Sequence, residues 1–190
     1  EEVGQSRWLN AVAVMALPDQ IEAIRELSFV KDIVLIASDL QLALCKTVEE
    51  QYQAADDKDV SQLTWQLERM QGQLFRDNGI DGTGIRIAVL DAGFPRVNTH
   101  DAFKHLREGH RILDTWNFPL KKADVYGWNA HGLMTLSCIT GMPNNNRIGL
   151  ATGAEFLLYR TEVELEPFKE EVWWMQGMER ADQHGANIIS

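Results

Sequence analysis

The sequence "GIRIAVLDAGF" at residues 84–94 contains a short run of apolar residues that ends on an aspartate. A strand of continuous apolar character is typical of a parallel sheet that is covered on both faces. In open parallel sheets, functional side chains gather just beyond the carboxyl ends of the strands. Asp91 occupies such an end, and a buried carboxylate requires hydrogen-bond donors or a cation nearby. We therefore expect Asp91 to belong to a functional site.

The sequence "NAHGLMTLSCITG" at 129–141 supplies a partner for this carboxylate. It predicts a helix over 131–140, so His131 lies at a helix start, and Gly132 lets another segment approach closely. Aspartate and histidine in this order are two members of a hydrolytic triad. Asp91 would fix the tautomer of the imidazole, and His131 would take the proton from a serine hydroxyl and return it to the leaving amine.

Strand-like and helix-like segments alternate from residue 85 onward, which predicts the α/β class with a mostly parallel sheet. "DNGIDGTG" at 77–84 is typical of a turn. The strands and helices that we expect lie at residues 85–91, 110–118, 131–140, 155–161, 167–185 and from 186 onward.

The first part of the chain has a pattern of its own. A strand is expected within 8–16, a helix from Pro18, and a second strand over 29–36, which together make a β-α-β unit. Roughly 30 residues bury too little apolar surface to be stable alone, so this unit should dock on another part of the chain.

Polar residues follow at 46–61 and are typical of an exposed linker. Beyond them, apolar residues recur at helical spacing, which predicts one buried face of an amphipathic helix. This face consists of Leu63, Leu67, Met70 and Leu74. The expected organisation is a small unit at 1–45, a linker at 46–61, and a larger domain at 62–190.

Composition excludes several classes of function. The chain has 190 residues, 45% of them apolar, a formal net charge of −10 and a pI of about 4.9. Such an acidic surface disfavours binding to nucleic acid. No apolar run reaches the roughly 18 residues of a membrane span. The two cysteines, Cys45 and Cys138, fit no metal-binding spacing, and we expect Cys138 to be a small core residue.

At these motifs the sequence resembles the subtilisin-like serine proteases. "GTGIRIAVLDAGF" from residue 82 is similar to their aspartate motif and "HGLMTLSCITG" to their histidine motif. "IGLATGAEFLLYRTE" at 148–162 and "ADQHGANIIS" at 181–190 resemble the segments that follow. The similarity covers roughly residues 78–190 and is closest to secreted subtilases of Bacteroidetes-type bacteria.

The resemblance implies a serine endopeptidase that acts on proteins or peptides and requires no cofactor. Asp91 would be the acid that orients the histidine, and His131 the general base. The fold implied is an incomplete, parallel-sheet subtilisin-like catalytic domain behind a small α+β propeptide-like unit. Residues 6–40 resemble the second half of such a propeptide. The implied location is secreted, periplasmic or at the cell surface.

Departures from the family pattern limit this expectation. The catalytic serine and the oxyanion-hole asparagine of the family would lie beyond Ser190, so we expect the chain alone to be inactive. Its partner would then be the remainder of its own catalytic domain. The threonine usual after His-Gly is Leu133. A non-catalytic, subtilase-like binding or inhibitory module is therefore the alternative.

Other interpretations stay open. Asp91 could be the phospho-acceptor of a receiver-like domain, although that interpretation calls for additional acidic residues at the first strand end and a late lysine, which the strands do not convincingly supply. "MPNNNRIGLA" at 142–151 is a candidate calcium loop, because some subtilases bind calcium there through carbonyl oxygens. His100, His105 and His110 are spaced by five residues, which is not the spacing of a helical zinc pair.

Overall fold

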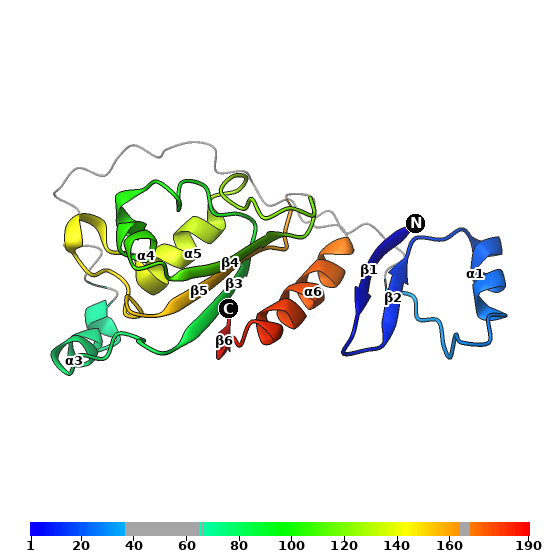
Figure 1. The fold of residues 1–190 in the computed structure, drawn as a ribbon, viewed down its shortest axis with the longest axis horizontal. Coiled ribbons are helices and arrows are strands. Elements are labelled where there is room, and N and C mark those ends of the chain that lie inside the picture. Colours follow the sequence, from blue (N-terminus) through cyan, green and yellow to red (C-terminus); the bar gives the residue numbers. More distant parts are fainter. Residues whose placement is uncertain (37–64, 66, 164–167) are drawn as a thin grey trace.

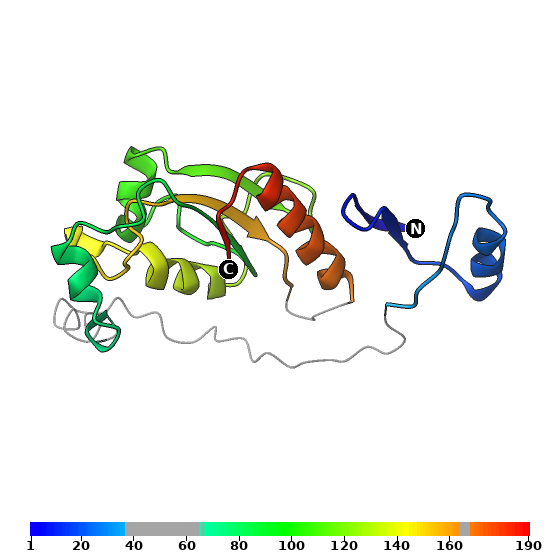
Figure 2. The same cartoon turned by 90° about the horizontal axis from the view of Figure 1, so that it is seen from below.

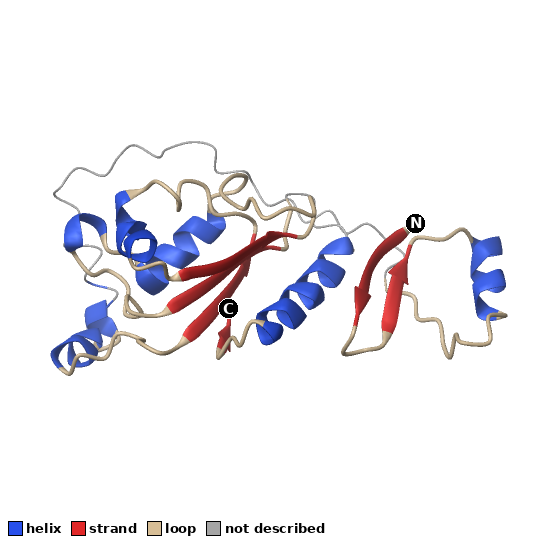
Figure 3. Ribbon diagram, viewed as in Figure 1, coloured by secondary structure: helices blue, strands red, loops and turns tan. Residues whose placement is uncertain are grey.

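The computed structural model describes residues 1–36, 65, 67–163 and 168–190. It contains a parallel sheet with helices on both faces, and a separate N-terminal hairpin with one short helix (Figures 1 and 3). The strands are β1 (Glu2–Ser6), β2 (Ala11–Val14), β3 (Arg86–Asp91), β4 (Ile112–Asn117), β5 (Glu155–Arg160) and β6 (Ile188–Ile189). The helices are α1 (Pro18–Arg25), α3 (Gly72–Asp77), α4 (Lys104–Glu108), α5 (His131–Thr140) and α6 (Lys169–Gln183), with 3-10 turns η2 (Asp101–Phe103) and η3 (Pro143–Asn145).

The larger sheet has the strand order β4-β5-β3-β6, and every pairing in it is parallel. This confirms the predicted α/β class. In the register, Asp91 lies opposite Arg160, and Arg160 lies opposite Asn117. The polar ends of the three strands β3, β5 and β4 therefore meet at one edge of the sheet.

The apolar run of β3 is buried because both faces of the sheet are covered. Ile87 and Val89 pack into a core with Phe94, Phe103 and Leu136, on the side of α4 and α5. Ala88 and Leu90 face the opposite side, where they pack with Ala181 of α6. Figure 2 shows α5 and α6 on opposite sides of the strands. The layers hold β3 rigidly, and Asp91 is its last residue.

The N-terminal unit differs from the predicted β-α-β arrangement. It is an antiparallel hairpin of β1 and β2 followed by α1, and the strand β1 was not predicted. Residues 29–36 form no strand, so that prediction was wrong. Phe29 is 82% exposed and Val34 76% exposed. An apolar run adopts a stable strand only when a neighbouring strand pairs with it, and β1 has already paired with β2.

The hairpin docks on α6, as expected for a unit too small to be stable alone. A Cβ atom at Gly4 of β1 would lie 2.7 Å from Cγ1 of Val172 and 2.9 Å from Cδ of Gln176. The absence of a side chain at Gly4 therefore allows β1 to contact the helix directly. Lys169 of α6 forms an ion pair with Glu1 over 3.7 Å.

The prediction of one buried helical face before β3 was also wrong. Leu67 is buried, but Met70 is 61% and Leu74 57% exposed. Gln71 adopts a left-handed conformation (φ 56°), which interrupts the helical path and rotates the following residues away from the expected face. Leu63 and the predicted linker at 46–61 lie outside the described residues.

The predicted turn at 77–84 is confirmed, with its three glycines at positive φ. The structure also contains the predicted α5, from His131 to Thr140. Across the described part of the chain, no helix has the length and apolar character needed to cross a bilayer.

Candidate active site

Asp91 lies at the centre of a small hydrogen-bonded site at the carboxyl edge of the sheet. Its side chain is almost fully buried. Oδ1 accepts a hydrogen bond from the backbone N–H of Ala92 (2.7 Å) and lies 2.8 Å from Nδ1 of His131. Oδ2 accepts a hydrogen bond from Oγ1 of Thr135 (3.1 Å). These contacts replace the water that the carboxylate loses on burial.

His131 is the exposed partner of this buried acid. His131 is the first residue of α5, and its backbone N–H donates a hydrogen bond to Oδ1 of Asn129 (2.9 Å). This bond fixes the start of the helix. The side chain is 63% exposed, although Nδ1 faces Asp91. Hydrogen bonding and charge attraction from Asp91 raise the pKa of His131 above its ordinary value, with a smaller contribution from Glu162. The pair therefore consists of a fixed acid and an accessible, strengthened base.

Close approach of α5 to β3 depends on glycine. A Cβ atom at Gly132 would lie 2.4 Å from the carbonyl oxygen of Gly93 and 3.0 Å from Cβ of Asp91. Any side chain at this buried position would push α5 away from the end of β3. Gly132 thus determines the separation between Asp91 and His131.

The sequence interpretation missed Thr135, the second side-chain donor to Asp91. It lies four residues after His131, so both side chains project from the same face of α5. Leu133, which occupies the position where threonine was expected, packs against the core instead. The four-residue spacing is the signal that could have identified Thr135.

Glu162 is another residue at this edge that was missed. It follows β5, whose last residue pairs with Asp91. One nitrogen or oxygen from each of Asp91, His131 and Glu162 lie within 4.8 Å of one another, an arrangement that could hold a metal ion. Both oxygens of Asp91 already accept hydrogen bonds, so a metal ion would have to compete with these donors for the carboxylate.

Trp128 covers the neighbouring part of the edge. Its ring centroid lies 4.7 Å from Cζ of Arg160 and 5.1 Å from Nζ of Lys122. Arg160 is buried, and its Nε donates to the carbonyl oxygen of Ala92 (2.9 Å), the residue after Asp91. Arg160, packed against the ring of Trp128, therefore holds the turn that follows β3.

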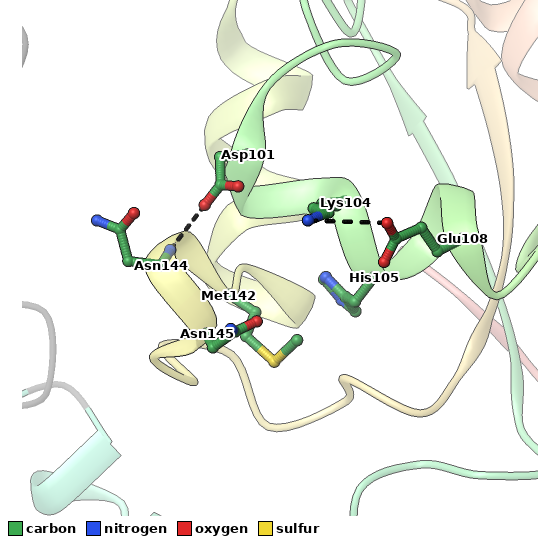
Figure 4. Close-up of a pocket in the computed structure, with 7 residues that line it drawn as sticks. All are labelled: Asp101, Lys104, His105, Glu108, Met142, Asn144 and Asn145. Atoms are coloured by element: carbon green, nitrogen blue, oxygen red, sulfur yellow. Dashed lines mark hydrogen bonds and ion pairs between the residues drawn. The ribbon is translucent and has the colours of Figure 1, made fainter.

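A separate concavity of about 430 Å³ lies between η3 and α4 (Figure 4). It contains the Asn-rich loop that was a candidate calcium site, and Asn144 donates its backbone N–H to Oδ2 of Asp101 (2.7 Å). Lys104 also lines this space and pairs with Glu108 over 3.7 Å. A resident ammonium group makes the donor set a poor fit for a second cation, and calcium binding stays a prediction.

The remaining candidate side chains have local contacts. Nδ1 of His100 accepts from the backbone N–H of Ala102 (3.2 Å), and Nε2 of His105 lies 3.1 Å from Oγ1 of Thr140. Cys138 is exposed, so its assignment to the core was wrong. It lies two helical turns after His131 and therefore shares the exposed face of that residue.

Comparison with known proteins gives two matches. Residues 82–190 match a family model described as the subtilase family. Residues 2–56 match one described as the peptidase S8 propeptide domain of Bacteroidota. No curated protein matches the chain. The first match contains the whole hydrogen-bonded site around Asp91, and the second contains the hairpin and α1.

Proposed function

The chain belongs to the subtilase family, and on this premise we propose that it comprises the propeptide and the first part of the catalytic domain of a serine endopeptidase. The observation that carries the proposal is the contact of 2.8 Å between Oδ1 of buried Asp91 and Nδ1 of exposed His131. A serine peptidase with an Asp-His-Ser triad needs such an imidazole, held by a carboxylate on one side and open to its nucleophile on the other.

In the proposed reaction, a serine from a segment outside these 190 residues attacks the scissile carbonyl of a peptide substrate. His131 accepts the serine proton on Nε2, while Nδ1–H remains bonded to Asp91. The resulting imidazolium is stabilised by the adjacent carboxylate. His131 then gives the proton to the leaving amine, and water repeats the sequence to release the acyl group.

The raised pKa of His131 supports this role. A general base is most effective when its pKa lies near the working pH, because it is then both unprotonated and sufficiently basic. Asp91 shifts the pKa of His131 upward and also fixes the ring orientation. This one contact therefore raises the pKa of His131 and fixes the orientation of its ring.

We propose that the N-terminal unit is the propeptide and that it assists folding by docking on α6. Ser6 Oγ and the backbone N–H groups of Arg7 and Trp8 donate to the carboxylate of Glu179. The match to a bacterial propeptide domain supports a protein that acts outside the cytoplasm. Its substrates would be proteins or peptides.

A second candidate is a non-catalytic module that keeps the subtilase shape and binds or inhibits another protein. Leu133 favours it, because this position in the family usually carries a threonine. The hydrogen bond from Thr135 to Asp91 favours the catalytic proposal, because it holds in place the carboxylate that orients His131.

Fluorophosphonate labelling and peptide hydrolysis by the full-length protein separate the two candidates. Labelling and turnover are expected, and Asp91→Asn should lower kcat by roughly 10³- to 10⁴-fold because the histidine loses its tautomer control. Asp77→Asn, at an exposed carboxylate on α3, is the matched control. Absence of labelling in a folded full-length protein would contradict the peptidase proposal.

A further inference from the structure

Trp128 has a backbone conformation that its residue type disfavours. Its φ is 66°, in the left-handed region that bulky side chains rarely enter. Gly127 and Asn129, on either side of it, are residue types that adopt this conformation at less cost. A large side chain is therefore held where a small one would make the turn more easily, and such strain gathers at functional sites.

The ring of Trp128 lies against two cations at the edge of the sheet. Cζ of Arg160, a buried residue, is 4.7 Å from the ring centroid, and Nζ of Lys122 is 5.1 Å from it. A guanidinium over an indole face is an attractive contact, and it is stronger when the cation is shielded from water. Because 41% of Trp128 is exposed, burial of apolar surface alone does not hold this side chain in place.

The same arginine connects Trp128 to the acid of the site. Nε of Arg160 donates to the carbonyl oxygen of Ala92 (2.9 Å), whose own N–H donates to Oδ1 of Asp91 (2.7 Å). On the other side, the chain runs from Trp128 to His131 in three residues. Arg160 therefore contacts both the turn that follows Asp91 and the segment that leads into His131.

Gly93 lets this turn and this segment lie against each other. A Cβ atom at Gly93 would lie 3.3 Å from Cβ of Trp128 and 3.1 Å from the carbonyl oxygen of Asn129. Asn129 in turn accepts the backbone N–H of His131 on its Oδ1 (2.9 Å). The segment 127–130 is therefore packed on the turn that follows β3, and a change in its path would move His131.

We propose that Trp128 is a positioning residue: through Arg160 it holds the segment before α5 on the sheet edge, and this keeps His131 oriented towards the acid. This inference rests on the proposed peptidase function. The contact of 2.8 Å between Oδ1 of Asp91 and Nδ1 of His131 depends on where α5 begins, and small displacements of such a pair lower the rate strongly. Trp128 acts through His131 and needs no contact with the substrate.

The test compares three substitutions at Trp128 in the full-length protein. Trp128→Leu removes the aromatic ring but keeps an apolar side chain, Trp128→Phe keeps a ring for the guanidinium, and Trp128→Gly removes the ring together with the backbone strain. We expect kcat for a peptide to fall by roughly tenfold or more in the Leu and Gly variants, with little change in KM, and to be largely retained with Phe. NMR titration of the Leu and Gly variants should show the pKa of His131 moving down towards its ordinary value, because the hydrogen bond and charge of Asp91 that raise it are loosened.

Trp174→Leu is the matched control. Trp174 is 51% exposed and belongs to α6, on the opposite side of the sheet from α5 (Figure 2). Neither kcat nor the pKa of His131 should change in this variant.

Wild-type kcat and wild-type pKa of His131 in Trp128→Leu or in Trp128→Gly would overturn the proposal, and either variant that folds is sufficient to decide. The titration separates this result from failure of the proposed function. If no peptide is cleaved but the pKa of His131 falls in Trp128→Leu and recovers in Trp128→Phe, the peptidase function is wrong and the positioning role of Trp128 is correct.

Discussion

Ser6 Oγ in the N-terminal hairpin donates a hydrogen bond to Oε1 of Glu179 in α6 over 2.5 Å, although 173 residues separate them. The other carboxylate oxygen accepts the backbone N–H of Arg7 (3.0 Å). Glu179 is buried, so these donors replace its water. One residue of α6 therefore accepts hydrogen bonds from the end of β1 and from the hairpin loop.

Glu179→Gln should loosen the hairpin, because an amide has only one acceptor oxygen and would direct an N–H₂ group at a donor. Amide exchange over residues 2–14 is expected to accelerate by roughly tenfold or more, since an unsatisfied buried donor costs about 1–3 kcal/mol. Glu171→Gln, on the exposed side of the same helix, is the control. Unchanged exchange in Glu179→Gln would show that the carboxylate does not hold the hairpin.

The docked hairpin should also be sensitive to acid. Burial raises the pKa of Glu179, but the hydrogen bonds from Ser6, Arg7 and Trp8 outweigh it, and the net pKa is below the ordinary value of 4.5. A carboxylate with a lowered pKa contributes stability that is complete above its unfolded pKa and is lost as pH falls through its folded pKa. Exchange at residues 2–14 should therefore accelerate below about pH 4.5, and Glu179→Gln should remove this component.

Thr135 should act on catalysis by positioning Asp91. Thr135→Val removes the hydrogen bond to Oδ2 while keeping the shape, and kcat of the full-length protein should fall by roughly tenfold with little change in KM. Thr135→Ser should restore kcat. Ser137→Ala is the control, because that hydroxyl bonds only the carbonyl oxygen of Met134 in the described structure. A purely structural role would lower stability without shifting the pH–rate profile, and that outcome would contradict the prediction.

Gly132 should tolerate no side chain. Gly132→Ala places Cβ 2.4 Å from the carbonyl oxygen of Gly93, which should destabilise the domain by about 1–3 kcal/mol and separate His131 from Asp91. Thermal unfolding of the 190-residue chain checks the first effect, and NMR titration of His131 checks the second through a lowered pKa. Gly127→Ala, where a Cβ has nothing within 4 Å, should be close to neutral. Equal melting temperatures for the two variants would refute this explanation.

His105 should make the domain less stable in mild acid. Burial, together with the charges of Arg111, Arg107 and Arg147, lowers the pKa of His105 to about 4, although Thr140 partly opposes this. The unfolded chain therefore binds more protons between its ordinary pKa of 6.5 and about 4, so stability falls as pH decreases through this window. Urea unfolding should show a loss of at most roughly 3 kcal/mol. His105→Gln should remove the part of this slope that belongs to the imidazole.

The central elements could be predicted because their signals are local. The apolar run before Asp91 and the helix that starts at His131 are each contained in a few consecutive residues. The hairpin could not be predicted equally well, because strand pairing joins residues whose compatibility no single segment reveals. Residues 29–36 have the composition of a strand but have no partner among the described strands.

The structure brings together Asp91 and His131, the two residues that were predicted from their types and order, and it adds two neighbours that were not predicted. Thr135 and Glu162 are ordinary surface-type residues in the sequence, and only the approach of α5 and β5 to the end of β3 brings them to Asp91 and His131. Cys138 is exposed because it lies two turns after His131 on the same face of α5. Helical position relative to His131 would have predicted both Thr135 and Cys138 correctly.

In the described structure, the groups that bond to the side chain of Asp91 all belong to residues between 92 and 135. During synthesis, this part of the chain leaves the ribosome as one piece, and β5 follows it by a short interval. The acid and the base can thus be assembled in the nascent chain ahead of any later nucleophile. Under the proposed peptidase function, the nascent chain would hold the acid and the base side by side before the serine is synthesised.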